Sequence, residues 1–252
     1  MLRSLRVRIS QGRQYIPDLR AASPANYRGL PTIAAGACAE GCRQCAEACP
    51  AQAFVALAPV TIDLGRCSQC GDCAPACPEY KLTFSAGCHT AAVAREHLLV
   101  TAERPNPPPI AVQRALKQQF GRSLRLRSVS AGGCNGCEAE LNAAGNVNFD
   151  MGRFGIEFVA SPRHADGLVI SGPITRNMAE PLQLCYDAMP RPRFVLAYGA
   201  CAISGGVFGD APQLERQFIA DNVPVLYLPG CPPHPLTLIN GLMDVLGIEL
   251  PK

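Results

Sequence analysis

Apolar and polar positions alternate in the second half of the chain in a way that predicts strands. The run Leu124-Arg125-Leu126-Arg127-Ser128-Val129 places its apolar side chains on one face. Further strand candidates follow at 155–159, 168–170, 194–197 and 225–228. Helical stretches fit between and after them, near 175–189, 211–220 and 235–247. This alternation predicts an α/β fold with a doubly wound, flavodoxin-like parallel sheet, which binds ligands beyond the carboxyl ends of its strands.

The first half of the chain has no such alternation and divides into three parts. Residues 1–32 form a basic arm, residues 33–84 are dense in Cys, Ala and Pro, and residues 85–110 end in a stiff, Pro-rich stretch. We therefore predict four parts: the arm 1–32, a small α+β domain 33–84, a linker 85–110 and the sheet domain 111–252.

Cysteine content changes the picture most, because 14 of the 252 residues are cysteine. A chain of this length can bury a core without crosslinks. No secretory signal and no membrane-spanning apolar run is evident, so we expect a cytoplasmic protein in which clustered cysteines bind metal. The net charge of +3 and the lack of interleaved aromatic and basic residues argue against nucleic acid as a partner.

Two tandem cysteine runs lie in residues 38–78. The second run, Cys67-x2-Cys70-x2-Cys73-x3-Cys77-Pro78, has the spacing of bacterial ferredoxins. The first run is Cys38-x3-Cys42-x2-Cys45-x3-Cys49-Pro50, with one extra residue in its first gap. Residues 51–66 between the runs leave room for a short hairpin. Zinc is the alternative, but zinc sites commonly use two separated pairs of ligands, so two runs that each end in Cys-Pro favour iron–sulfur.

The tandem runs resemble the two-cluster [4Fe–4S] ferredoxin module. The resemblance implies that one cluster is held by Cys38, Cys42, Cys45 and Cys77, and the other by Cys67, Cys70, Cys73 and Cys49. The wider first gap departs from the family pattern at Cys38. Without Cys38 as a ligand, the first site could hold a three-iron cluster.

Four more cysteines follow predicted strands of the sheet domain. Cys134 and Cys137 follow the strand at 124–129, Cys201 follows the strand at 194–197, and Cys231 follows the strand at 225–228. Ligands of a doubly wound sheet gather at these strand ends, and four thiolates there can hold a [4Fe–4S] cluster. Flanking glycines let backbone amides approach the sulfurs. A thioredoxin-like redox pair, half a zinc site and unrelated buried cysteines are the alternatives.

Longer motifs around these cysteines carry a second resemblance. They are Gly133-Cys134-Asn135-Gly136-Cys137-Glu138, Gly199-Ala200-Cys201-Ala202-Ile203-Ser204-Gly205-Gly206 and Pro229-Gly230-Cys231-Pro232-Pro233-His234-Pro235. They resemble the small subunit of [NiFe]-hydrogenases, in the membrane-associated, complex-I-related branch of formate hydrogenlyase type, whose relatives include the NADH-quinone oxidoreductase 20 kDa subunit. Complex I subunits typically have adjacent cysteines in the first motif, so the C-x2-C spacing of this chain favours the hydrogenase side.

The two resemblances together imply a fusion of a ferredoxin-like subunit with a hydrogenase small subunit, supported by Tyr27-Arg28-Gly29-Leu30-Pro31 before the tandem runs. The implied function is to relay electrons through three [4Fe–4S] clusters to or from the active site of a large subunit. Implied partners are that [NiFe] large subunit, membrane subunits of the same complex and an electron donor or acceptor protein. The implied location is the inner face of the cell membrane, as a peripheral part of the complex.

Two other functions fit the same residues. One is the electron-transfer subunit of a complex-I-like quinone oxidoreductase, and the other is a free-standing ferredoxin-like carrier or sensor. In each case we expect the isolated chain to have no catalytic residues of its own. Cys185 is expected to be a packed core thiol, and Cys88-His89 is either a stray pair or a vestige of a metal-binding tail. Glu138 is either a proton relay, a partner for an arginine of the large subunit, or a helix N-terminal carboxylate.

Overall fold

A computed structural model of the protein describes residues 2–12 and 14–249. Met1 and Arg13 of the predicted arm, and residues 250–252 of the predicted sheet domain, lie outside the described residues.

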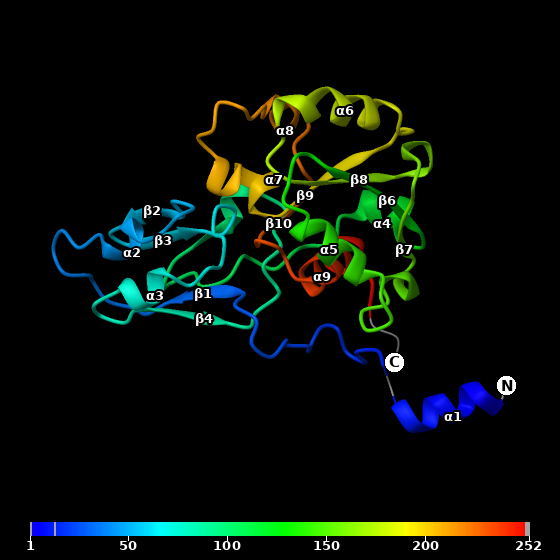
Figure 1. The fold of residues 1–252 in the computed structure, drawn as a ribbon, viewed down its shortest axis with the longest axis horizontal. Coiled ribbons are helices and arrows are strands. Elements are labelled where there is room, and N and C mark those ends of the chain that lie inside the picture. The colour runs from blue at the N-terminus through cyan, green and yellow to red at the C-terminus, as the bar shows by residue number, and fades with distance from the viewer. Residues whose placement is uncertain (1, 13, 250–252) are drawn as a thin grey trace.

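A five-stranded parallel sheet forms the centre of the second half (Figure 1). Its strands are β6 (Leu124–Ser130), β7 (Ile156–Phe158), β8 (Gly167–Ser171), β9 (Phe194–Tyr198) and β10 (Leu226–Leu228). Their order across the sheet is β10-β9-β8-β6-β7. If β6 is counted as the first strand and the sheet is read from β7 to β10, the order is 2-1-3-4-5. This is the flavodoxin-like order. The predicted α/β class is confirmed, and all five predicted strands are present.

Helices cover both faces of this sheet (Figure 1). One face carries α6 (Arg176–Asp187) and α8 (Gln217–Asp221). The other carries α4 (Arg114–Phe120), α5 (Gly136–Ala144) and α9 (Pro235–Leu246). Short helical turns are α7 (Ala200–Ser204), η2 (Met151–Phe154), η3 (Pro162–His164) and η4 (Gly206–Phe208).

The helix predicted over 211–220 is wrong in its first half, because α8 begins only at Gln217. Residues before it pair with the loop that precedes α6. The amide of Arg176 donates to Gln213 O, and the amide of Glu215 donates to Ile174 O. These long-range bonds hold the segment extended.

The cysteine-rich part folds into two small antiparallel sheets, one of β1 and β4 and one of β2, β3 and β5. Their bounds are β1 Leu30–Ile33, β2 Phe54–Leu57, β3 Val60–Asp63, β4 Leu82–Ser85 and β5 Leu99–Val100. Two single-turn helices, α2 (Gln44–Glu47) and α3 (Cys73–Ala76), lie beside them. The hairpin predicted between the cysteine runs is the pair β2 and β3.

The segment predicted as a linker takes part in both halves of the molecule. Its turn η1 (Arg95–Leu98) leads into β5, which pairs with β3. Ala92 exchanges two backbone hydrogen bonds with Tyr227 of β10, at 3.0 and 2.8 Å. Leu98 and Val100 are fully buried in a core that also contains residues of β6, β8 and β9. The two halves therefore share one apolar core.

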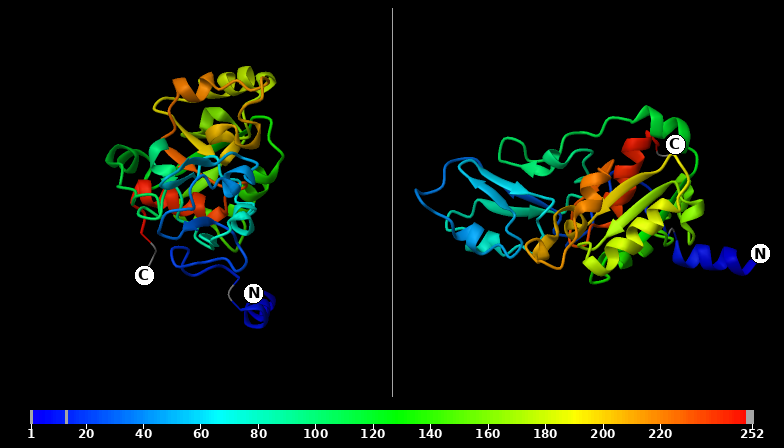
Figure 2. Two further views of the ribbon diagram at one scale, coloured as in Figure 1. Left: turned by 90° about the vertical axis from the view of Figure 1, so that its left-hand side faces the viewer. Right: turned by 90° about the horizontal axis from the view of Figure 1, so that it is seen from above.

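The arm begins with helix α1 (Leu2–Gln11), which projects from the body of the molecule in all three views (Figures 1 and 2). Residues after it are fixed to α9, since Leu19 is fully buried and Arg20 pairs with Asp244 at 2.5 Å. No helix in the described part of the chain is long and apolar enough to cross a membrane.

Candidate metal centres

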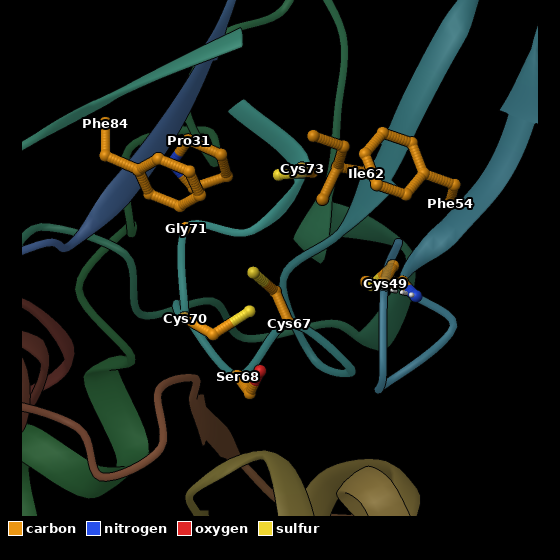
Figure 3. A pocket seen from close by; sticks show the side chains of 11 residues that line it. Pro31, Cys49, Phe54, Ile62, Cys67, Ser68, Cys70, Gly71, Cys73 and Phe84 are labelled. Atoms are coloured by element: carbon orange, nitrogen blue, oxygen red, sulfur yellow. Dashed lines mark hydrogen bonds between the residues drawn. The ribbon is translucent and has the colours of Figure 1, made fainter. Parts of the chain in front are cut away.

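Cys49, Cys67, Cys70 and Cys73 line one cavity. Figure 3 shows Cys67, Cys70 and Cys73 with their sulfur atoms turned toward a common space, and Cys49 approaching from the turn before β2. Phe54, Ile62 and Phe84 complete an apolar lining. Backbone amides already point at two of the sulfurs, from Ala53 to Cys49 at 3.3 Å and from Gln69 to Cys67 at 3.4 Å. This is the second ligand set predicted from sequence.

Cys38, Cys42, Cys45 and Cys77 line a separate cavity. Its other lining residues are Leu57, Pro78 and Glu79. Cys38 thus lies with the other three members of the first predicted set, in spite of its longer spacing. The loop that carries it is tied to the second cysteine run, because the amide of Ala39 donates to Glu79 at 3.0 Å.

Cys134, Cys137, Cys201 and Cys231, which we call the third set, come together past the carboxyl ends of three strands. Cys134 lies in the loop after β6, Cys137 in α5, Cys201 in α7 after β9, and Cys231 in the loop after β10. Burial raises the pKa of Cys201 to about 11, and the nearby thiols of Cys231 and Cys134 act in the same direction. Their placement at strand ends is as predicted, whereas their binding of a cluster stays a prediction.

Glycines bring the backbone close to the third set, as expected. Gly199 has φ +93°, and a Cβ atom there would lie 2.7 Å from Cys137 Sγ. A Cβ atom on Gly206 would lie 3.0 Å from Cys201 Sγ. Side chains at these two positions would occupy the space of the thiols, so the turns after β9 require glycine.

The donor set fits iron–sulfur clusters in chemistry and in environment. Burial raises the pKa of Cys67 to about 12, with small additional effects from Cys49, Cys73 and Cys70. Buried thiols of this kind ionise only when a cation compensates the negative charge, and the iron of a cluster would supply that charge. Within the described residues, no three His, Cys, Asp or Glu side chains are arranged to hold a single metal ion. A four-iron cluster takes four thiolates around a wider space.

Neighbouring sets lie close enough for their thiols to influence one another. Burial raises the pKa of Cys73 to about 11, and Cys45 of the first set contributes beside Cys49 and Cys70. Burial likewise raises the pKa of Cys231, with contributions from Cys134 and from Cys70 of the second set. Helix α2, which carries Cys45, also packs on helix α3, which carries Cys73, and Tyr27 joins the loops of Cys70 and Cys231. The second set therefore lies between the first and the third.

Tyr27 and His234 link the loops of the second and third sets. The Tyr27 hydroxyl pairs with Gln69 Oε1 at 3.2 Å, between Cys67 and Cys70. The Tyr27 ring packs on His234, with centroids 5.1 Å apart, three residues after Cys231. Their contact joins residues more than 200 positions apart, and no local sequence signal indicates it.

Glu138 lies in the first turn of α5, where it accepts a hydrogen bond from Ser171 Oγ at 2.5 Å. Burial acts to raise its pKa, but hydrogen bonds from Ser130 and Ser171 outweigh burial, and the net pKa is lowered. The structure thus supports a helix N-terminal carboxylate held by Ser171.

The two cysteines outside the three sets are packing residues. Cys88 is buried in the core under α9, and its thiol donates to Ala86 O at 3.6 Å. His89 pairs through Nε2 with Arg20 O at 2.9 Å. Cys185 lies in α6 and packs against the shared core, as expected.

Comparison with known proteins agrees with this site. The family described as "NADH ubiquinone oxidoreductase, 20 Kd subunit" matches residues 134–245, a range that contains all four cysteines of the third set. A relative from Pyrococcus furiosus, described as a "probable membrane-bound hydrogenase subunit", is 41% identical over 134 residues, which are 52% of this chain and 77% of the relative.

The chain belongs to the 20 kDa subunit family. Formate hydrogenlyase subunit 7 of Escherichia coli is 41% identical over 140 residues, 55% of this chain and 54% of that protein. An NADH-quinone oxidoreductase subunit of Geotalea daltonii is 45% identical over 117 residues, 45% of this chain and 68% of that protein. A chain in a membrane-bound sulfane sulfur reductase structure is 27% identical and covers 53% of this chain and 74% of that one, with a TM-score of 0.43. Residues 1–133 lie outside the family match.

Proposed function

We propose that the protein is an electron-transfer subunit of a membrane-associated [NiFe]-hydrogenase complex and holds three [4Fe–4S] clusters. The first two belong to a ferredoxin-like domain fused to the 20 kDa subunit domain. The third lies next to the active site of a partner large subunit. When bound, such clusters accept and release single electrons.

The order of the cysteine sets is the observation that carries this proposal. Cys45 and Cys73 lie on helices α2 and α3, which pack together, and Tyr27 contacts the loops that carry Cys70 and Cys231, so the three sets form one continuous row. The first set lies at the end of the molecule farthest from the sheet, beside a groove lined by residues 33–43. That groove is where we propose that the donor or acceptor protein docks.

The chain's own residues keep this row fixed. Ser204 Oγ donates to Gly65 O at 2.8 Å, which ties α7 to the loop that leads into Cys67. Asp63 accepts two hydrogen bonds from Arg95 and one from the amide of Gly65. The lining of the first two cavities is mostly apolar, which strengthens the electrostatic influence of nearby charges.

The names of the relatives divide between hydrogenases and quinone oxidoreductases. The C-x2-C spacing of Cys134 and Cys137 favours the hydrogenase side. A quinone-reducing complex is the second candidate, supported by the relatives that are named as subunits of NADH-quinone oxidoreductase. In both cases we place the chain on the cytoplasmic side of the membrane, bound to membrane subunits of the complex.

The amounts of iron and acid-labile sulfide per purified chain test whether three clusters are bound. We expect about twelve of each per chain. In Cys231→Ala the count should fall by about four, and one electron paramagnetic resonance (EPR) signal should disappear. In Cys185→Ala, the matched control, both should stay unchanged. Zinc in place of iron, or a full count in Cys231→Ala, would contradict the proposal.

Nickel in the complex purified through this chain decides between the two candidates. We expect nickel and H2 oxidation or evolution. A complex without nickel that reduces quinone would replace the hydrogenase by the second candidate. A chain that purifies with three clusters and no large subunit would show a free-standing carrier instead.

A further inference from the structure

Arg216 reaches from the residue before α8 to the end of α7, the short helix that carries Cys201. Nη1 donates to Pro173 O at 3.2 Å and to Cys201 O at 3.1 Å. Nη2 donates to Ala202 O at 2.7 Å and to Ile203 O at 2.9 Å. One guanidinium thus binds four backbone carbonyls, three of which belong to α7.

Cys201 O also accepts from the amide of Gly205 at 2.8 Å, so Arg216 adds a second bond there, and it binds Ala202 O and Ile203 O near the end of the helix. The last carbonyls of a helix have no partner within it, and a helix of five residues is not stable by itself. The planar fork of Arg presents its N–H groups in fixed directions, which a flexible Lys ammonium does not. Arg216 therefore fixes the position of α7, and with it the position of Cys201.

The charge of Arg216 is not neutralised by a carboxylate. Arg216 is half-buried, and the ion pairs found among residues 2–12 and 14–249 do not include it. Arg95, the other cation near it, is paired with Asp63 at 2.5 Å. Within the third set, Glu138 places a negative charge beside Cys137.

We propose, resting on the proposed function, that Arg216 is a positioning residue for the third cluster that also sets its reduction potential. Reduction adds one electron and no proton, so the cluster becomes more negative by one charge. A nearby unpaired cation stabilises that reduced form. Arg216 therefore raises the midpoint potential of the third cluster relative to the same site without this charge.

A redox titration of the holoprotein, poised with dithionite and mediators and followed by EPR, tests this assignment. The signal that disappears in Cys231→Ala is taken as the third cluster. In Arg216→Gln we expect a lower midpoint potential. At a fixed solution potential, the ratio of reduced to oxidised cluster should fall about tenfold, which corresponds to 59 mV for a one-electron couple. Arg216→Lys keeps the charge and should keep the potential near that of the wild type.

Arg193→Gln is the matched control. Arg193 also binds two carbonyls and lies next to a strand of the same sheet, but at the opposite end from the cysteines, and it is paired with Asp187. It should leave the potential unchanged. An unchanged potential in Arg216→Gln, or an equal fall in Arg216→Lys, overturns the electrostatic assignment.

Arg216→Lys also tests the positioning role if Arg216→Gln retains too little cluster to titrate. Lys cannot bind the four carbonyls together, so we expect a broader EPR signal and faster loss of the third cluster to a chelator than in Arg193→Lys. Equal line width and retention would overturn the positioning role. If the wild type itself lacks the signal that depends on Cys231, the proposed function fails instead.

Discussion

His234 shows how a single side chain serves both the fold and the site. It precedes α9, and its Nδ1 accepts a hydrogen bond from the amide of Leu236 at 3.1 Å. The centroid of its ring lies 5.1 Å from the ring centroid of Tyr27 and 5.5 Å from that of Phe149. Burial lowers the pKa of His234 below 6.5. The neutral form is therefore the native one, because a proton on Nδ1 would remove the acceptor.

This pKa makes stability depend on pH in a defined direction. Below pH 6.5 the unfolded chain binds a proton at His234 that the folded chain does not, so stability falls as the pH drops through the lowered pKa. His234→Asn keeps a cap acceptor and does not titrate. Between pH 7 and pH 5 the free energy of unfolding of the wild type should fall. We expect this fall to be smaller by about 1 kcal/mol in His234→Asn, as measured by thermal unfolding at each pH.

The exposed His164→Asn is the control for this experiment, since it should leave the pH dependence of the unfolding temperature unchanged. An unaltered pH dependence in His234→Asn would show that other groups cause it.

At the scale of the element, the strand-end turns carry the third set. The turn from β9 into α7 begins at Gly199, whose amide donates to Leu228 O at 2.8 Å and so ties the turn to β10. Positive φ and the contact with Cys137 both exclude a side chain at this position. The local geometry of one turn thus positions thiols that come from three different segments.

Gly199→Ala should remove the third cluster selectively. The added Cβ atom would lie 2.7 Å from Cys137 Sγ and displace it. We expect iron to fall by about four atoms per chain while the other two clusters stay. Gly12→Ala is the control, because Gly12 also has positive φ, +66°, but nothing lies within 4 Å of its Cβ position. Loss of all three clusters in Gly199→Ala would indicate general misfolding.

The strands and the strand-end cysteines could be predicted because both follow from local pattern. Alternation indicated β6, and Gly-Cys motifs placed Cys201 and Cys231 directly after apolar runs. The late start of α8, the cap formed by His234 and the four carbonyls bound by Arg216 could not be predicted. Each depends on backbone groups that are distant in sequence, and periodicity carries no information about them.

The whole molecule is held together by contacts between its two halves. Gly65, just before the second cysteine run, is buried against α7 and against Arg95. A Cβ atom there would lie 2.7 Å from Ile203 Cγ2 and 2.9 Å from Arg95 Cζ. This tight contact and the Ser204 hydrogen bond to Gly65 O set the distance between the second and third cysteine sets.

Gly65→Ala should loosen this contact. We expect stability to fall by about 1–3 kcal/mol, as for other overpacked sites, and proteolysis between the two halves to become faster. Gly87→Ala is the control, since the nearest atom to its Cβ position is Ser85 Oγ at 3.3 Å. Thermal unfolding and limited proteolysis measure both effects, and equal behaviour of the two variants would mean that the contact at Gly65 is unimportant.

The core that residues 30–100 share with the sheet has a consequence for biosynthesis. If the two halves were separate proteins, their ratio would depend on two rates of translation and on an association constant. Here a single ribosome makes all three thiol sets in a ratio of one to one to one, and their encounter needs no diffusion. Dilution of the protein cannot separate the second set from the third, so the cell needs no excess of either half of the molecule.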